Sequence, residues 1–162
     1  MRKWIPLTLA VLLLPLSGCN KLSFKEFSSP EGKFSVLMPG NPDKKTQSVE
    51  GLTVVGYGVE VRNGAFAVFY ADIPPGRPFN LSGGIKGAVA PYGGSVLSEK
   101  DYTFEGATGK EFEADAKNPK GYLSGRMFVI NNRWYQVVAM GGNARLSNSD
   151  VQTFLNSFKL LK

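Results

Sequence analysis

The chain has 162 residues, of which 43% are hydrophobic and 20% are charged, and its formal net charge is +6. This length is sufficient for one domain with a buried core. The chain has no histidine and a single cysteine, Cys19. These counts exclude Ser-His-Asp hydrolases, most zinc sites, intramolecular disulfides and cysteine metal clusters. The basic residues are scattered along the sequence, so nucleic acid is not an expected partner.

Residues 1–18 have the three parts of an export signal peptide. Two basic residues come first, a run of apolar residues follows, and small residues precede Cys19. The apolar run is shorter than the roughly 18 residues that span a bilayer, and its two prolines would interrupt a long helix. We therefore expect a cleaved signal peptide and no permanent transmembrane helix.

The segment Leu16-Ser17-Gly18-Cys19 resembles the lipobox of bacterial lipoproteins. The resemblance implies that Cys19 is lipidated and that the chain is cleaved before it, which gives an exported envelope protein held on a membrane by acyl chains such as palmitate. Residues 19–25 would then be the lipidated N-terminus and a short linker, and residues 26–162 a single domain. Asn20 is not the aspartate typical of inner-membrane retention, which favours the outer membrane, facing the periplasm, in a cell with two membranes.

The first half of the domain is predicted to be mostly β-strand. Short strands are expected at residues 24–27 and 33–38, followed by a turn and a polar loop over residues 43–48. Two longer strands, Leu52–Arg62 and Ala65–Ile73, alternate between two faces. Between them, Asn63-Gly64 favours a type I′ turn, in which both residues have positive φ. Both faces of the second strand are apolar, which is typical of a central strand.

The second half is predicted to contain two helices and four strands. After a proline-rich loop, apolar residues recur at helical spacing from Leu81 to Tyr92. Strands are expected at residues 96–104, 108–116, 122–130 and 133–140, with Asn131-Asn132 as a tight turn. Ser147 and Asp150 approximate a capping box before an apolar stripe that predicts the second helix. This order, with hairpin-length connections, predicts an α+β domain in which an antiparallel β-sheet is covered by two helices.

Three segments of the chain resemble the two ends of PsbP-like domains: residues 27–39, 134–138 and 151–158. That family includes extrinsic proteins of the photosynthetic oxygen-evolving complex and many bacterial lipoproteins. The resemblance implies a PsbP-like sandwich. The matched motifs are framework motifs without chemical groups of their own, so the resemblance concerns the fold rather than an activity.

One row of acidic residues was considered as a catalytic or metal site. Glu111, Glu113 and Asp115 alternate along a predicted strand and would be about 7 Å apart on one face, near the spacing of glycosidase carboxylates. The alternating apolar residues would take the inward face, so a solvated row of acids is the stronger interpretation. A calcium site that adds Asp101 lacks the closely spaced ligands of a calcium loop. We predict no catalytic residue, no metal and no cofactor, and therefore no enzymatic activity.

The leading hypothesis is a lipid-anchored, non-enzymatic interaction or accessory module with an envelope protein as partner. The expected contact is the loop Pro74–Phe79, because prolines lower the cost of ordering and Arg77 and Phe79 are residue types that often dominate interfaces. The competing interpretation is a rigid connector whose Phe79 enters the core. The alternative function is binding of a small apolar ligand between sheet and helix, where small residues would leave room: Gly56, Gly58, Ala67 and Ala71.

Overall fold

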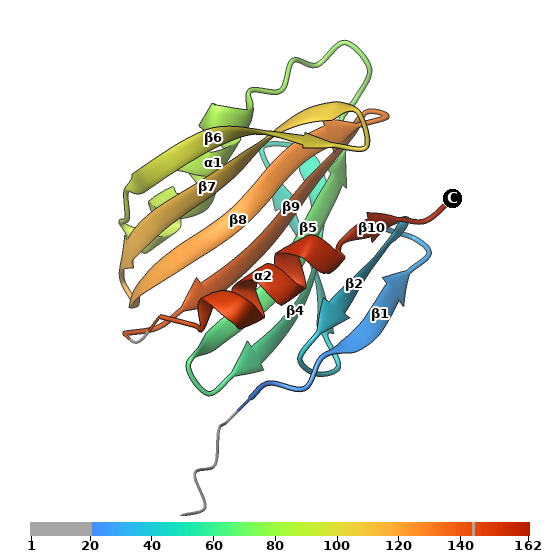
Figure 1. The fold of residues 1–162 in the computed structure, drawn as a ribbon. Coiled ribbons are helices and arrows are strands. Elements are labelled where there is room, and N and C mark those ends of the chain that lie inside the picture. Colours follow the sequence, from blue (N-terminus) through green and yellow to red (C-terminus); the bar gives the residue numbers. More distant parts are fainter. Residues whose placement is uncertain (1–20, 144) are drawn as a thin grey trace, which may run out of the picture.

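The computed structural model describes residues 21–143 and 145–162 (Figure 1). The predicted signal peptide, the lipobox and Cys19 lie outside the described residues. Among the described residues, no helix has the length and apolar composition needed to cross a bilayer.

The fold consists of two antiparallel sheets and two α-helices (Figure 1). A seven-stranded sheet has the order β3-β4-β5-β9-β8-β7-β6, with strands Asp43–Val49, Leu52–Val61, Gly64–Asp72, Arg133–Gly141, Lys120–Ile130, Ala107–Lys117 and Val96–Phe104. A three-stranded sheet has the order β1-β2-β10, with strands Lys25–Ser29, Phe34–Met38 and Lys159–Leu160. The helices are α1 (Leu81–Val89), followed by the short 3₁₀ helix η1 (Ala90–Tyr92), and α2 (Asn148–Ser157). The predicted α+β class is confirmed.

The two faces of the large sheet have separate hydrophobic clusters. Helix α2 and the small sheet pack on one face, around Phe34, Phe66 and Phe154, which are each fully buried. Helix α1 packs on the other face through Ile85 and Val89, over the β6, β7 and β8 half of the sheet. Strand β5 lies between β4 and β9 and contributes apolar residues to both clusters, as its sequence predicted. Burial of apolar side chains on both faces is the main stabilising contribution to the fold.

The segment predicted to be a polar loop is a strand. Strand β3 pairs with β4 along its whole length, from Asp43↔Gly58 to Val49↔Leu52, yet all of its residues are exposed. Backbone hydrogen bonds to β4, rather than the packing of a buried face, hold β3 in place. The prediction was wrong because a polar strand at a sheet edge has no hydrophobic alternation to identify it.

The predicted type I′ turn at Asn63-Gly64 is also wrong. Val61 pairs with Gly64, so the two central residues of the turn are Arg62 and Asn63, and none of Arg62, Asn63 and Gly64 has positive φ. Gly64 has a different requirement. A Cβ atom added there would lie 2.0 Å from the carbonyl oxygen of Met140 on β9, so only glycine permits this close approach of the strands.

Three other hairpins have turns in which both central residues have positive φ, as in type I′ turns. These residues are Glu50-Gly51, Glu105-Gly106 and Asn131-Asn132. The tight turn predicted at Asn131-Asn132 is therefore confirmed.

Both predicted helices are confirmed, and each begins with a capping side chain, of which the sequence predicted only the one before α2. Asn80 precedes α1, and its Oδ1 accepts a hydrogen bond from the Gly83 amide at 2.8 Å. Ser147 precedes α2, and its Oγ accepts from the Asp150 amide at 3.1 Å. Each side chain satisfies an amide that the first helical turn leaves unpaired.

The two ends of the domain meet on the α2 face. The Leu37 amide of β2 donates to Ser157 Oγ of α2 at 2.8 Å, and the rings of Phe34 and Phe158 stack with centroids 5.5 Å apart. Strand β10, which the sequence did not predict, then pairs with β2. The family-like segments at the two ends of the sequence thus form one structural unit.

Candidate functional site

The loop between β5 and α1, which includes Pro74–Phe79, projects from one end of the large sheet (Figure 1, light green). Its backbone begins with a tight turn, in which the Arg77 amide donates to the Pro74 carbonyl at 3.1 Å. Gly76 has a φ of 80° and follows Pro75, the arrangement of a type II turn. The prolines and this turn restrict the loop backbone, so a partner would order few additional torsions on binding.

Arg77 links this loop to the neighbouring hairpin. Its Nη2 donates to the Glu50 carbonyl oxygen at 3.0 Å and lies 4.0 Å from a carboxylate oxygen of Glu50. The Arg77 side chain nevertheless remains 37% exposed. The loop and the β3–β4 turn therefore form one surface, with a guanidinium group accessible at its centre.

Phe79 has a different environment from Arg77. Its ring centroid lies 6.0 Å from that of Trp134, and its edge is close enough to Gly84 that a Cβ there would be 3.1 Å away. Phe79 is partly buried and belongs to the periphery of the α1 cluster. It fixes the loop to the domain, which agrees with the competing interpretation for this residue, whereas Arg77 remains available to a partner.

The acidic row lies on the face of β7 opposite α1, as its alternation predicted. Phe112, Ala114 and Ala116 are buried beneath α1. Glu111 accepts a hydrogen bond from Nε of Arg126 at 2.8 Å. The Glu111 carboxylate is therefore paired with a basic residue of the neighbouring strand β8, which disfavours a catalytic role and supports a structural one.

Arg126 is a buried charge that the sequence interpretation did not include. It is 8% exposed, and besides Glu111 it donates to the Leu155 carbonyl at 3.0 Å and to Asn156 Oδ1 at 2.9 Å. Its guanidinium group also lies 4.5 Å from the ring centroid of Tyr102. These contacts join the last turn of α2 to the β6–β8 part of the sheet.

Asp101, the further acid considered for calcium, is on the other face of the sheet. Lys110 lies 2.8 Å from Asp101 and 3.4 Å from Glu99, and its hydrogen bond to Asp101 lowers the pKa of the Asp101 carboxyl. Within the described residues, no group of three or more acids, histidines or cysteines is placed to bind a metal ion.

A second polar cluster fixes the β1–β2 turn to the ends of β5 and β9. Arg133 donates through Nε and Nη2 to both carboxylate oxygens of Asp72, at 2.6 and 2.9 Å, and through Nη1 to the Glu31 carbonyl at 2.9 Å. Hydrogen bonding to Arg133 lowers the pKa of the Asp72 carboxyl. The Tyr135 hydroxyl donates to the Gly32 carbonyl at 2.8 Å. The cluster uses its polar groups for internal bonds and so acts in folding.

The space expected for an apolar ligand is occupied by side chains. The ring of Phe69 covers Gly56 so closely that a Cβ there would be 2.6 Å from the ring, and Ala71 is buried. Two open grooves lie among the described residues, with volumes of about 120 and 150 Å³. The first, between α2 and the sheet, is bordered by polar residues such as Glu113, Arg145 and Gln152. Neither groove has the size or apolar lining typical of a lipid-like ligand site.

Comparison with known proteins supports the fold. Neither protein-family models nor curated protein sequences give a match. By structure, the chain is similar to the solution structure of a cyanobacterial PsbP (CyanoP) from Synechocystis sp. PCC 6803, with a TM-score of 0.59 and 13% sequence identity. The similarity covers 91% of this chain and 98% of that chain. The PsbP-like fold is therefore confirmed, and function must be argued from this chain's own residues.

Proposed function

We propose that this protein is a lipid-anchored accessory module of the cell envelope, which binds a protein partner and catalyses no reaction. Lipidation of Cys19 would hold the domain at a membrane surface after export. The partner would bind the surface formed by the loop Pro74–Phe79 and the β3–β4 turn, with Arg77 as its central contact.

The observation that supports this function best is the contrast between the loop and the rest of the molecule. The acid Glu111 and the bases Arg126 and Arg133 are used in internal hydrogen bonds. The loop is restricted by its turn and by Phe79, and Arg77, although it donates to the Glu50 carbonyl, keeps more of its side chain exposed than Arg126 or Arg133 does. A restricted backbone that presents an exposed guanidinium group is suited to binding a protein surface at low entropic cost.

The anchor is tested by palmitate labelling of cells that produce wild type or Cys19→Ala. We expect label in the wild-type protein and none in the variant, which should remain uncleaved or be released from the membrane. Equal labelling of both proteins would contradict lipidation at this residue.

The binding surface is tested by crosslinking in native membranes followed by pull-down. Arg77→Glu should lose the crosslinked partner, while the matched reversal Lys86→Glu on the exposed side of α1 should retain it. Both are surface changes, so the free energy of unfolding should change by no more than about 0.5 kcal/mol. Retention of the same partner by folded Arg77→Glu would place the interaction elsewhere.

A further inference from the structure

The two ends of the large sheet differ in the charge of their connections. The antiparallel topology brings five connections to one end: residues 39–42, 62–63, 90–95 and 118–119, and the connection after β9, of which residues 142–143 and 145–147 are described. Together these connections contain no aspartate or glutamate. The connections at the opposite end of this sheet include two acids, Glu50 and Glu105, and the β1–β2 turn of the small sheet adds Glu31.

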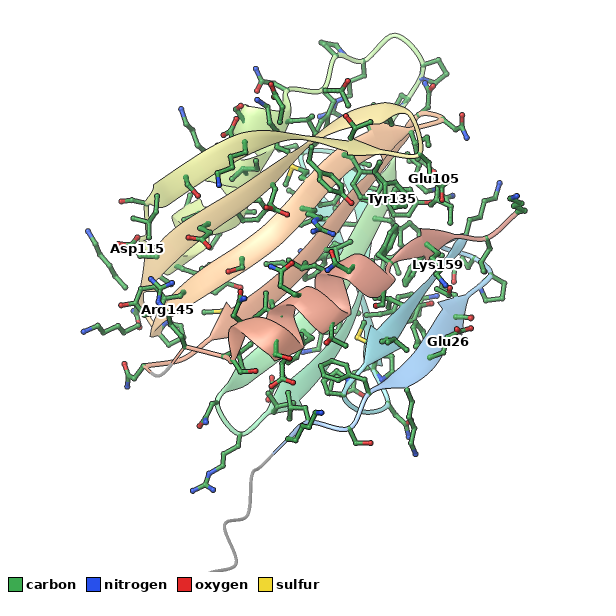
Figure 2. The ribbon with its side chains drawn as sticks, viewed as in Figure 1. Glu26, Glu105, Asp115, Tyr135, Arg145 and Lys159 are labelled. Carbon is green, nitrogen blue, oxygen red and sulfur yellow. The ribbon has the colours of Figure 1, made fainter. Side chains whose placement is uncertain are left out.

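Hydrogen bonds and packing confirm that the first group of connections lies together. The Gly142 amide donates to the Asn63 carbonyl at 2.8 Å, and the Asn118 amide donates to the Tyr92 carbonyl at 3.1 Å. The guanidinium carbon of Arg145, a residue labelled in Figure 2, lies 4.0 Å from the ring centroid of Tyr122, at the start of β8.

Five basic side chains are exposed on this end of the molecule, which we call the basic end: Lys21, Arg62, Lys117, Lys120 and Arg145. Among the described residues, the observed ion pairs involve none of the five. Four acids also lie at this end: Asp43 and Glu60 are exposed near strand ends, Asp115 accepts a hydrogen bond from the Ser95 amide, and Asp150 is bonded to the hydroxyl of Ser147 at 2.6 Å. Arg62, Lys117 and Lys120 lie closer to the turns than Glu60 and Asp115 do, so the outermost residues of this end are positively charged.

The described chain also begins at the basic end (Figure 1, blue). Phe24 packs edge-on against Phe66 near the start of β5, with ring centroids 5.8 Å apart. If Cys19 is the anchor, Phe24 is five residue steps away from it along the chain, and an extended chain spans at most about 3.5 Å per residue. Phe24 would then lie within about 18 Å of the Cys19 backbone.

We propose that the basic end binds the anionic headgroups of the membrane to which the protein is attached. The inference rests on the proposed lipid anchor for its geometry, and adds that the domain is oriented with the loop Pro74–Phe79 pointing away from the membrane. One exposed lysine or arginine near an anionic bilayer increases partitioning about fivefold, an effect that decays within a Debye length of about 10 Å. Five such residues on one end can orient a domain that the lipid anchor alone would leave free to rotate.

The test uses residues 20–162 without lipid, so its outcome does not depend on lipidation of Cys19. This segment includes every strand and both hydrophobic clusters described above, and circular dichroism with a thermal midpoint confirms that each variant is folded. Binding is measured by co-sedimentation with vesicles of phosphatidylcholine alone or mixed with phosphatidylglycerol, at low and high salt. We expect binding to the mixed vesicles that salt abolishes, and little binding to phosphatidylcholine.

Two double variants that change the net charge equally distinguish vesicle binding through the basic end from an effect of the overall charge. Arg62→Glu with Lys120→Glu, on the basic end, should reduce partitioning at least about 25-fold. Lys159→Glu with Lys162→Glu, at the opposite end, should reduce it less than about fivefold. Equal loss in both variants, or equal binding of wild type to the two kinds of vesicle, would overturn the proposal, while the palmitate experiment would still decide the anchor.

Discussion

Tyr70 and Tyr135 are paired across β5 and β9, with ring centroids 6.4 Å apart, and among the described residues only Tyr135 has a partner for its hydroxyl group. The Tyr135 hydroxyl donates to the Gly32 carbonyl, whereas the buried Tyr70 hydroxyl makes no hydrogen bond among the described residues. Two similar residues in one core therefore differ in what their oxygen contributes to stability.

Removing the hydroxyl oxygen of each tyrosine should change the free energy of unfolding differently at neutral pH. Tyr135→Phe should lower the free energy of unfolding by about 1–3 kcal/mol, because the Gly32 carbonyl loses its buried donor. Tyr70→Phe should leave it unchanged or slightly higher, because an unpaired polar atom is removed from the core. Urea denaturation monitored by fluorescence gives both values, and a loss in Tyr70→Phe as large as in Tyr135→Phe would indicate a hydrogen bond to Tyr70.

The same pair predicts a response to alkali. Burial and the nearby negative charge of Glu31 raise the pKa of Tyr70 from 10.0 to about 12. Above pH 10 the unfolded chain therefore loses this proton before the folded chain does, so the folded state binds more protons and stability falls as pH rises toward 12. Tyr70→Phe should show a shallower fall over this interval. Part of the fall should remain, because burial also raises the pKa of Tyr135. Identical pH profiles for wild type and Tyr70→Phe would contradict this assignment.

Gly64 should be intolerant of any side chain, because of strand β9 rather than a turn. Gly64→Ala should cost about 2 kcal/mol or more, since its Cβ would meet the Met140 carbonyl oxygen at 2.0 Å and the strands would have to separate. Gly58→Ala on β4 is the control. Its Cβ would be 3.7 Å from the Cβ of Ala67, an ordinary contact, so stability should change by less than about 1 kcal/mol. Similar denaturation midpoints for the two variants would show that strands β5 and β9 leave room for a Cβ atom at Gly64.

Arg126 should be more important to stability than its partner Glu111. Arg126→Ala leaves the Leu155 carbonyl and Asn156 without their donor and opens a space under α2, so a loss of about 3–5 kcal/mol is expected. Glu111→Gln retains an acceptor oxygen and is 39% exposed, so its cost should be about 1 kcal/mol or less. Thermal unfolding of both variants measures the difference, and equal losses would mean that the charge pair, not the contacts to α2, is what matters.

The sequence predicted best those elements whose own residues alternate or recur. The strands from Leu52 to Ile73 and the helices starting at Leu81 and Asn148 were identified because their buried residues follow a local period. Strand β3 was missed because its position depends on backbone pairing with β4 alone. The constraint on Gly64 was attributed to the wrong cause, because the atom that restricts it belongs to Met140, distant in sequence.

The environments of the candidate site residues were harder to predict than the fold, because their contacts depend on the topology. Arg77 and Phe79 could be selected from the sequence as one loop, but the partial burial of Phe79 is determined by Trp134. No sequence pattern indicated the structural role of Arg126, since its partners Glu111 and Leu155 come from a neighbouring strand and a later helix. The basic end likewise exists only because antiparallel strands bring separate turns together.

The pairing of β2 with β10 has a consequence for how the protein reaches its location. Lys159 pairs with Ser35, so the small sheet cannot be completed until nearly all of the described chain is available. Contacts between residues so far apart in sequence form slowly. If the protein is exported from its N-terminus, as proposed, the segment already translocated would lack its last strand and the helix that covers its core. That segment would then acquire its final stability only after the C-terminal residues had also crossed the membrane.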